Sequence, residues 1–273
     1  MKRIVSLAIA VLLVGVVLMS VTACSSSSNQ FKVGMECAYA PFNWTQTDSS
    51  NGAVPIQGTN QFAGGYDVEM AKLIAKGLGK ELVIVKTAWE GLTPAVQAGT
   101  IDAIIAGMSP KPDRRETIDF TDYYYASSLV IVVKKGGKYE NATSLADFTG
   151  AKITGQIDTV HYEAIDQIPG VEKLDASKDF TTMRVALESG TIDGYVSERP
   201  EGVSAQIANS NFKMIELAEG KGFVVTNDLI SISVGLKKGS ELTEKINSIL
   251  AGISAEQRNQ FMENAIKNQP MAE

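Results

Sequence analysis

The tetrapeptide Gly-Thr-Ile-Asp stands at residues 99–102 and again at residues 190–193. A stretch compatible with a helix precedes each copy, and Ala-Ile-Ile-Ala (103–106) or Gly-Tyr-Val-Ser (194–197) follows it. Both places are typical of a helix that ends at a glycine with positive φ and then leads into a buried strand. Such a unit is half of a βαβ motif. Two copies therefore predict two α/β lobes of similar construction, with a ligand cleft at the ends of their strands. The alternative is a chance match of four residues.

The composition limits the class of protein. The 273 residues suffice for one large domain or two small ones, and a hydrophobic content of 44% suffices for a packed core. The formal net charge of −6 argues against a nucleic-acid partner, because phosphate binding calls for concentrated Lys and Arg.

The N-terminus has the pattern of a secretory signal at residues 1–23. Lys2 and Arg3 form a basic start, and an almost unbroken apolar run leads to Cys24 and four serines. The alternative is a retained transmembrane anchor, since the run is long enough to be marginal for one. Val-Thr-Ala-Cys at residues 21–24 resembles the lipobox of bacterial lipoproteins, which implies cleavage before Cys24 and its acylation, as by palmitate.

The lipoprotein hypothesis places the mature chain at the extracytoplasmic face of a cell membrane. Residues 24–30 are rich in serine and have no apolar face, which is typical of a flexible tether. If Cys24 carries lipid, Cys37 has no partner for a disulfide within the monomer, and we expect it to be a small buried residue.

The remainder of the chain alternates between helical and strand-like patterns. In the first part we expect a strand, a long loop, a helix, a strand and a helix with Pro94 in its first turn, at residues 31–37, 45–64, 66–78, 82–85 and 92–98. Further along we expect strands at 128–133, 151–156 and 229–236 and helices at 159–165, 181–188 and 201–209. Two helices follow in the tail, the second starting at a capping box of Ser254 and Gln257. This alternation indicates an α/β protein.

Six segments carry a resemblance to a known family. They are Val-Gly through Ala-Pro-Phe (33–42), Gly-Tyr-Asp-Val (65–68), Gly-Leu-Thr-Pro-Ala (91–95), Ile-Asp-Ala-Ile-Ile-Ala-Gly-Met (101–108), Pro-Asp-Arg-Arg (112–115) and Ile-Asp-Phe-Thr-Asp-Tyr-Tyr (118–124). In this order and spacing they resemble the bacterial extracellular solute-binding proteins, family 3, which deliver amino acids to ABC importers. The resemblance implies a fold like periplasmic-binding-protein type II, a free L-amino acid as ligand and the importer's permease as partner.

The resemblance also implies how the chain divides. Lobe 1 would comprise residues 31–126 and 229–273, and lobe 2 residues 127–228, so that each lobe holds one copy of the repeat. The strand-like segments 129–133 and 231–236 would be the hinges between the lobes.

An amino acid carries both charges on one carbon, so its site needs a cation for the carboxylate and an anion for the ammonium group. Arg114 follows the first repeat, and a guanidinium can bind a carboxylate through two parallel hydrogen bonds, which lysine cannot do. From the residues alone, a surface arginine paired with Asp113 or Glu116 is an equal alternative. The resemblance implies that Arg114 binds the carboxylate.

Three more residues match positions that surround the ligand carboxylate in this family. Gly107 and Ser109 match positions whose backbone and hydroxyl groups face the ligand. Thr159 matches a residue of lobe 2 whose amide and hydroxyl close on the ligand carboxylate. The alternative for Thr159 is a plain helix cap. The family pattern has glycine where Ile157 stands and a small residue where Asp158 stands, so the chain departs from it here.

The ammonium acceptor would come from the second repeat. Glu198 follows that repeat at a position where the family usually has Asp, and the alternative is a solvated acid in a loop. The two repeats would then bring opposite charges to the cleft from opposite lobes. Tyr39 and Trp89 match aromatic positions that enclose the ligand side chain, and an aromatic face suits an aliphatic stem or a cation. The alternative for both is ordinary core packing.

Glu36 bears on which amino acid binds. It stands at a position where binders of lysine, arginine and ornithine carry an Asp, and a carboxylate there would pair with a cationic side chain. It could also accept a hydrogen bond from a glutamine amide or a histidine. We therefore favour a basic ligand over glutamine or another polar one.

No catalytic set is evident in the sequence. His161 is the one histidine, and a lone histidine is more often structural than catalytic. One His and two Cys give no metal-binding spacing, and we expect no cofactor. The competing hypotheses are a dehydratase-type enzyme, with Glu198 as proton donor, and a sensory receptor. A lipid anchor without a cytoplasmic domain fits delivery to an importer better than either.

Overall fold

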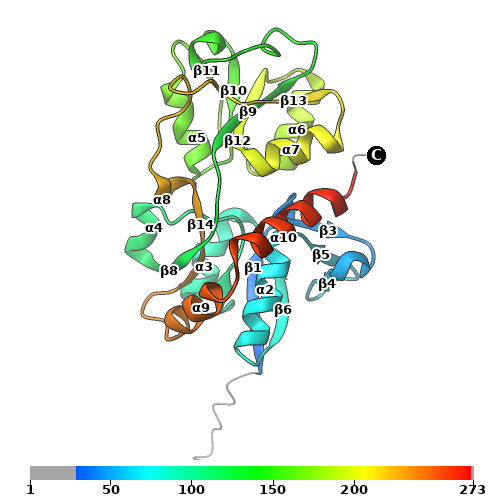
Figure 1. Ribbon diagram of the computed structural model, residues 1–273, viewed down its shortest axis with the longest axis vertical. Coiled ribbons are helices and arrows are strands. Elements are labelled where there is room, and N and C mark those ends of the chain that lie inside the picture. Colours follow the sequence, from blue (N-terminus) through cyan, green and yellow to red (C-terminus); the bar gives the residue numbers. More distant parts are fainter. Residues whose placement is uncertain (1–28, 272–273) are drawn as a thin grey trace, which may run out of the picture.

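The structure, a computed structural model, describes residues 29–271. The predicted signal sequence and the predicted lipidation at Cys24 lie outside the described residues. Figure 1 shows two α/β parts, one above the other, each built around its own sheet. We call the part that contains β1 lobe 1 and the part that contains β9 lobe 2; the residue boundaries implied by the resemblance stay a prediction. Within the described residues, no helix has both the length and the apolar character needed to cross a membrane.

Lobe 1 is built on a five-stranded sheet whose strands come from distant parts of the chain. In spatial order they are β6 (Glu81–Lys86), β1 (Gln30–Met35), β7 (Ala103–Ile104), β14 (Ser231–Lys237) and β8 (Ile118–Ala126). β1 pairs in parallel with β6 and β7, and β14 is antiparallel to β7 and β8. Its helices are α2 (Tyr66–Gly77), α3 (Trp89–Ala98), α4 (Pro112–Thr117), α9 (Leu242–Ala251) and α10 (Ala255–Asn268).

Lobe 2 has a second sheet of the same size. Its strands are β11 (Glu172–Lys173), β10 (Lys152–Thr154), β12 (Gly194–Glu198), β9 (Leu129–Lys134) and β13 (Phe212–Ile215). β10 is parallel to β11 and β12, whereas β9 is antiparallel to β12 and β13. Its helices are α5 (Val160–Ala164), α6 (Phe180–Ser189) and α7 (Arg199–Ala208), with 3₁₀ turns at Leu145–Phe148 and Ile165–Gln167.

The two copies of Gly-Thr-Ile-Asp make the same contacts in the two lobes. Each preceding helix, α3 or α6, ends at the glycine of the tetrapeptide in the left-handed conformation, with φ of 73° and 76°. The carboxylates of Asp102 and Asp193 each accept a 2.8 Å hydrogen bond from a main-chain N–H of the neighbouring strand, that of Lys32 and that of Lys152. Each aspartate N–H donates back to the carbonyl of the same lysine, again at 2.8 Å. The repeat is therefore one structural device used twice, and the chance-match alternative is wrong.

The long loop predicted at residues 45–64 is wrong in part. β2 (Ala38–Tyr39), β3 (Asn43–Gln46), β4 (Val54–Pro55) and β5 (Phe62–Gly64) form a small antiparallel sheet in the order β2-β3-β5-β4. A 3₁₀ turn at Ser50–Gly52 connects two of the strands. The strands are too short for an alternating pattern to show in the sequence. Buried Trp44, Ile56 and Ala63 nevertheless join this segment to the core of lobe 1.

The segments predicted as hinges are strands inside the two sheets. Residues 129–133 belong to β9 of lobe 2, and residues 231–236 belong to β14 of lobe 1. The chain crosses between the lobes beside them, at Ser127 and Ser128 and again near α8 (Asn227–Ile230). The two crossing segments are joined where Ser127 N–H donates to the carbonyl of Ile230 at 3.1 Å.

Two predictions about helix starts have different outcomes. The capping box at the start of α10 is confirmed: Ser254 and Gln257 each accept a hydrogen bond from the other's main-chain N–H. Pro94 is not in the first turn of its helix, because α3 begins three residues earlier than predicted, at Trp89.

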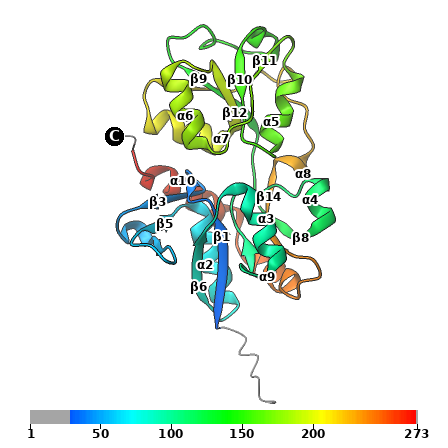
Figure 2. The same ribbon diagram turned by 180° about the vertical axis from the view of Figure 1, so that it is seen from behind.

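The C-terminal segment is a further connection between the lobes. Figures 1 and 2 show α10 leading from lobe 1 to a position beside α7 of lobe 2. Just beyond α10, the buried side chain of Gln269 accepts from the hydroxyl of Ser204 in α7 and donates to the main-chain carbonyl of Ser204 at 3.3 Å.

Candidate ligand-binding site

The eight predicted ligand residues lie where the lobes meet. Glu36 and Tyr39 follow the end of β1, Trp89 begins α3, and Gly107 and Ser109 follow β7; Arg114 is in α4, Thr159 caps α5 and Glu198 ends β12. The six with larger side chains are each at most 7% exposed, and the other two are half-buried. The strand ends of both sheets therefore supply polar groups to one buried region.

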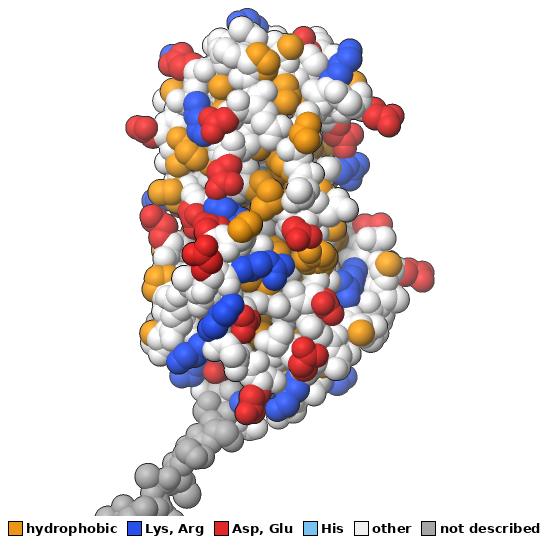
Figure 3. All heavy atoms as spheres, turned by 90° about the vertical axis from the view of Figure 1, so that its left-hand side faces the viewer, with side chains coloured by type: hydrophobic (Ala, Val, Ile, Leu, Met, Phe, Trp, Pro, Cys, Tyr) orange, Lys and Arg blue, Asp and Glu red, His pale blue; other side chains and the backbone are white. Residues whose placement is uncertain are grey.

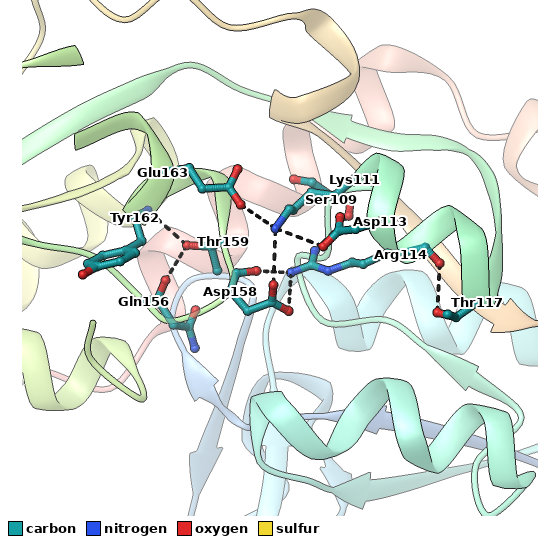
Figure 4. A network of polar contacts seen from close by, with 10 residues as sticks. All are labelled: Ser109, Lys111, Asp113, Arg114, Thr117, Gln156, Asp158, Thr159, Tyr162 and Glu163. Carbon is teal, nitrogen blue, oxygen red and sulfur yellow. Dashed lines mark hydrogen bonds and ion pairs between the residues drawn. The ribbon is translucent and has the colours of Figure 1, made fainter. Parts of the chain in front are cut away.

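Arg114 is buried at the boundary between the lobes. Its Nη1 donates to the carbonyl of Ser109 at 2.9 Å, and its Nη2 donates to the carbonyl of Asp158 in lobe 2 (Figure 4). The Asp158 carboxylate lies 3.5 Å from Nη2, and the guanidinium lies 5.0 Å above the ring of Trp89. Among the described residues, its buried Nε has no hydrogen-bond partner. The alternative of a surface arginine is wrong, because Arg114 is only 5% exposed.

Lys111 is a second buried cation that the sequence reasoning missed. Figure 4 shows its Nζ between carboxylates of both lobes: Glu163 at 2.6 Å, Asp158 at 3.3 Å and Asp113 at 3.5 Å. Its side chain is 7% exposed. A lysine between two prolines carries no local signal of such a role. Lys111 and Arg114 both pair with Asp158, so this end of the site is a network of buried cations and carboxylates.

Thr159 acts as a helix cap in this structure. Its Oγ1 accepts from Tyr162 N–H at 3.4 Å and donates to the carbonyl of Gln156 at 2.7 Å. The preceding residue, Asp158, is in the left-handed conformation with φ of 57°. Ile157 is not, so the backbone geometry that favours glycine falls one residue later than the family pattern suggested.

Glu198 of lobe 2 and Tyr39 of lobe 1 meet at the boundary between the lobes. The Tyr39 hydroxyl donates to Glu198 Oε1, and the Tyr39 ring stacks on Phe180 of lobe 2 with centroids 4.4 Å apart. Burial raises the pKa of Glu198 to about 8, against the opposing effect of the Tyr39 hydrogen bond. Phe180 is a second residue that the sequence reasoning missed, since an aromatic residue starting an amphipathic helix looks like ordinary core.

The two carboxylate oxygens of Glu36 have different surroundings. Its Oε1 accepts from the amide of Gln156 at 3.0 Å, which is another contact between the lobes. Its Oε2 is buried and has no hydrogen-bond partner in the part of the chain that the structure describes. Burial raises the pKa of Glu36 to about 7, and the charge of Asp179 adds to this rise. A cation or donor beside Oε2 would therefore relieve a buried, half-satisfied carboxyl group.

His161 also lies at this boundary. It lines a small cavity with Ser109 and Glu198, and its ring meets Phe180 edge-on at 6.0 Å. Its buried Nδ1 has no hydrogen-bond partner within residues 29–271, and burial together with the Arg114 charge lowers the pKa of His161 to about 4. The imidazole is therefore neutral at physiological pH.

The boundary between the lobes holds both kinds of group that a zwitterion needs, a guanidinium and carboxyl groups. Arg114 and Lys111 lie beside Asp158, while the two carboxyl groups of raised pKa, Glu36 and Glu198, come from opposite lobes. Figure 3 shows acidic and basic side chains interspersed on one face at the level where the lobes meet. The described residues contain no group of three or more His, Cys, Asp or Glu placed to hold a metal ion.

Two α/β lobes that the chain crosses twice, with polar groups from both at their boundary, define a protein that binds a small molecule between its lobes. The chain belongs to the bacterial extracellular solute-binding proteins, family 3, whose model matches residues 31–265.

Named relatives and solved structures agree with this assignment. The chain is 26% identical over 254 residues to ABC transporter arginine-binding protein 1 of Escherichia coli K12, covering 90% of this chain and 93% of the relative. An ancestral arginine-binding protein bound to arginine is 28% identical and has a TM-score of 0.69, with 86% of this chain and 97% of the other covered. An ancestral arginine-binding protein bound to glutamine is 27% identical, with the same TM-score of 0.69 and coverages of 86% and 96%.

Proposed function

We propose that this protein captures a basic L-amino acid, arginine or lysine, for delivery to the permease of an ABC importer. The observation that carries the choice of ligand is the buried Oε2 of Glu36, which has no hydrogen-bond partner among residues 29–271. A guanidinium or ammonium side chain beside it would pair with the carboxylate and favour its charged form. The arginine-binding relative from Escherichia coli supports the same choice.

The backbone part of the ligand would be held at the other groups of the site. Arg114 would bind the carboxylate, with Gly107, Ser109 and Thr159 near it, and Glu198 would accept from the ammonium group. Two of these contacts have a stand-in within the chain. The Asp158 carboxylate lies beside Arg114, and the Tyr39 hydroxyl donates to Glu198. A ligand that binds both lobes stabilises the closed arrangement by its differential affinity for it.

Glutamine is the second candidate, and one observation favours it. Glu36 already accepts a hydrogen bond from the amide of Gln156, so an amide is a suitable partner for this carboxylate. The ancestral arginine-binding protein bound to glutamine supports this alternative.

A thermal-shift screen against the twenty amino acids, ornithine and citrulline tests the proposal. We expect the largest shifts with arginine or lysine and a smaller one with glutamine. Glu36→Gln should weaken binding of arginine at least about tenfold, because it removes a buried charge pair, and should change glutamine binding much less. A response to glutamine alone would reject the basic ligand while keeping the amino-acid site.

The protein would bind its ligand without changing it. Tyr39 holds Glu198, the proton donor of the dehydratase hypothesis, from the opposite lobe. Incubation with the bound amino acid, followed by mass spectrometry, should return that amino acid unaltered. A converted product would favour the enzyme.

We further propose that Cys24 carries a lipid that holds the protein at the extracytoplasmic face of the membrane. Labelling of cells with palmitate should mark the unsubstituted protein and leave Cys24→Ala unmarked. Cys37, which is buried and free, serves as the internal control, because its thiol is not accessible to acylation. Label retained in Cys24→Ala would exclude this anchor.

A further inference from the structure

We propose that Asp67 is a positioning residue for amino-acid binding, because its carboxylate holds both ligand-facing loops of lobe 1 in place through Asn43 and Tyr124. The inference rests on the proposed amino-acid site. Asp67 is the second residue of α2, and its side chain, like those of Asn43 and Tyr124, is fully buried. None of the three was a candidate ligand residue in the sequence.

One arm of this network leads to the loop that carries Glu36 and Tyr39. Asn43 Nδ2 donates to Asp67 Oδ2 at 2.8 Å, and Asn43 Oδ1 accepts from the main-chain N–H of Cys37 at 2.8 Å. Cys37 lies between the two ligand residues and has φ of 55°, a conformation that non-glycine residues rarely adopt. A fixed acceptor for its N–H therefore stabilises an unfavourable turn.

The other arm leads to the loop that carries Gly107 and Ser109. The Tyr124 hydroxyl donates to Asp67 Oδ1 at 2.8 Å and accepts from Gly107 N–H at 3.2 Å. Gly107 has φ of 64° and packs so closely on Tyr39 that an added Cβ would lie 2.7 Å from its ring. The two loops braced by Asp67 thus meet each other at Tyr39.

At residue 67 the network requires a side chain that accepts hydrogen bonds and donates none. The amide of Asn43 and the hydroxyl of Tyr124 both donate hydrogen bonds to residue 67. An ionised carboxylate can accept both, one at each oxygen. An amide at residue 67 would turn a donor toward one of them and leave a buried group unsatisfied. Burial raises the pKa of Asp67 to about 6, while the hydrogen bonds from Tyr124 and Asn43 favour the ionised form.

Exchanging the two side chains separates this role from simple packing. Asp67→Asn places an amide against donors, whereas the double variant Asn43→Asp with Asp67→Asn restores every hydrogen bond, because the acceptor-only group moves to residue 43. Tyr66→Phe is the matched control. It removes another buried tyrosine hydroxyl, which donates to the main-chain carbonyl of Tyr124 at 2.8 Å rather than to Asp67.

Two readouts test the proposal. Calorimetry with L-arginine should show affinity at least about tenfold weaker in Asp67→Asn, the cost expected of an unsatisfied buried group, and recovery to within about threefold in the double variant. Hydrogen exchange followed by NMR should show faster exchange of the Cys37 and Gly107 amides in Asp67→Asn and slow exchange again in the double variant. Tyr66→Phe should lower the melting temperature but keep affinity and both exchange rates.

The proposal is overturned if the Cys37 and Gly107 amides exchange in Asp67→Asn as slowly as in the unsubstituted protein, or if the double variant behaves like the single one. The exchange readout needs no ligand. If the unsubstituted protein fails to bind L-arginine, the choice of ligand is wrong, and the exchange rates still decide whether Asp67 holds the two loops.

Discussion

At the scale of single residues, the site depends on carboxyl groups that the fold buries. Glu36 and Glu198 come from different lobes, and burial raises the pKa of each, to about 7 and about 8. The folded chain therefore favours their neutral forms, whereas a cationic ligand favours the charged ones. Binding and proton release should be coupled as a result.

The pH dependence of binding follows from this coupling. The folded pKa of Glu198 lies above its unfolded value, so the stability it contributes is complete below pH of about 4.5 and is lost as the pH rises through about 8. Binding of an ammonium group has the opposite dependence, because it needs the ionised carboxylate. Affinity should rise between pH 6 and pH 8, and calorimetry in buffers of different ionisation enthalpy should detect proton release. Glu198→Gln should reduce this release to the part that comes from Glu36, and a pH-independent affinity would contradict the assignment.

Arg114 gives a sharper test of the carboxylate site. Arg114→Ala should weaken amino-acid binding at least about thirtyfold, because a buried charged pair is lost, while circular dichroism shows the fold intact. Arg114→Lys keeps the positive charge but loses the planar guanidinium, which can donate two parallel hydrogen bonds to a carboxylate. It should therefore recover only part of the affinity. Unchanged affinity of the alanine variant by calorimetry would remove Arg114 from the site.

At the scale of elements, the repeated tetrapeptide fastens a strand to its neighbour in each lobe. Asp102 and Asp193 accept from main-chain N–H groups in equivalent places, but the surroundings differ. The bond from Lys32 to Asp102 is partly buried, whereas the bond from Lys152 to Asp193 is exposed to water. Water can replace a lost acceptor in the second case more easily than in the first.

Alanine at these two positions should therefore have unequal effects. Asp102→Ala should lower the free energy of unfolding by about 1–3 kcal/mol, the cost of an unsatisfied buried donor, and Asp193→Ala by less than about 1 kcal/mol. Urea denaturation of both variants measures the difference. Asp102→Asn is the control, since its amide oxygen can still accept from Lys32 N–H. Equal losses of unfolding free energy in the two alanine variants would show that burial of the hydrogen bond does not determine how much it contributes to stability.

At the scale of the whole molecule, side chains join the lobes at several points. Lys111 of lobe 1 contacts Glu163 of lobe 2, Glu36 contacts Gln156, and Gln269 beyond α10 reaches Ser204. Each contact favours the closed arrangement. Their sum sets how much of the binding energy of a ligand is needed for closure.

Lys111→Met should shift the molecule toward an open arrangement. The pair with Glu163 is only partly screened, since the lysine side chain is 7% exposed, so we expect several-fold weaker binding and a larger radius of gyration by X-ray scattering. Lys72→Met is the matched control, because Lys72 pairs with Glu69 within α2 at 2.7 Å and donates to the carbonyl of Gly52, also in lobe 1, at 3.2 Å. The same radius for both variants would show that Lys111 does not hold the lobes together.

How well each part of the structure could be predicted depended on how far apart in the sequence its interacting residues lie. The helix–glycine–strand units were predictable because residues a few positions apart determine where a helix ends. Predictions that drew on the family resemblance selected residues that do gather between the lobes, although their roles in binding remain predictions. Lys111 and Phe180 were missed, because nothing near them in the chain shows that their partners lie in the other lobe.

The sequence by itself determined the α/β class, the two repeated units and a set of charged residues at the strand ends, since short-range periodicity and glycine conformation carry that information. Only the tertiary structure decided which polar groups meet. Asp67 and Tyr124 are 57 residues apart, and Glu36 and Gln156 are 120 apart. Such contacts exist because folding buries both partners in the same place, where each polar group must find the other to offset its loss of water.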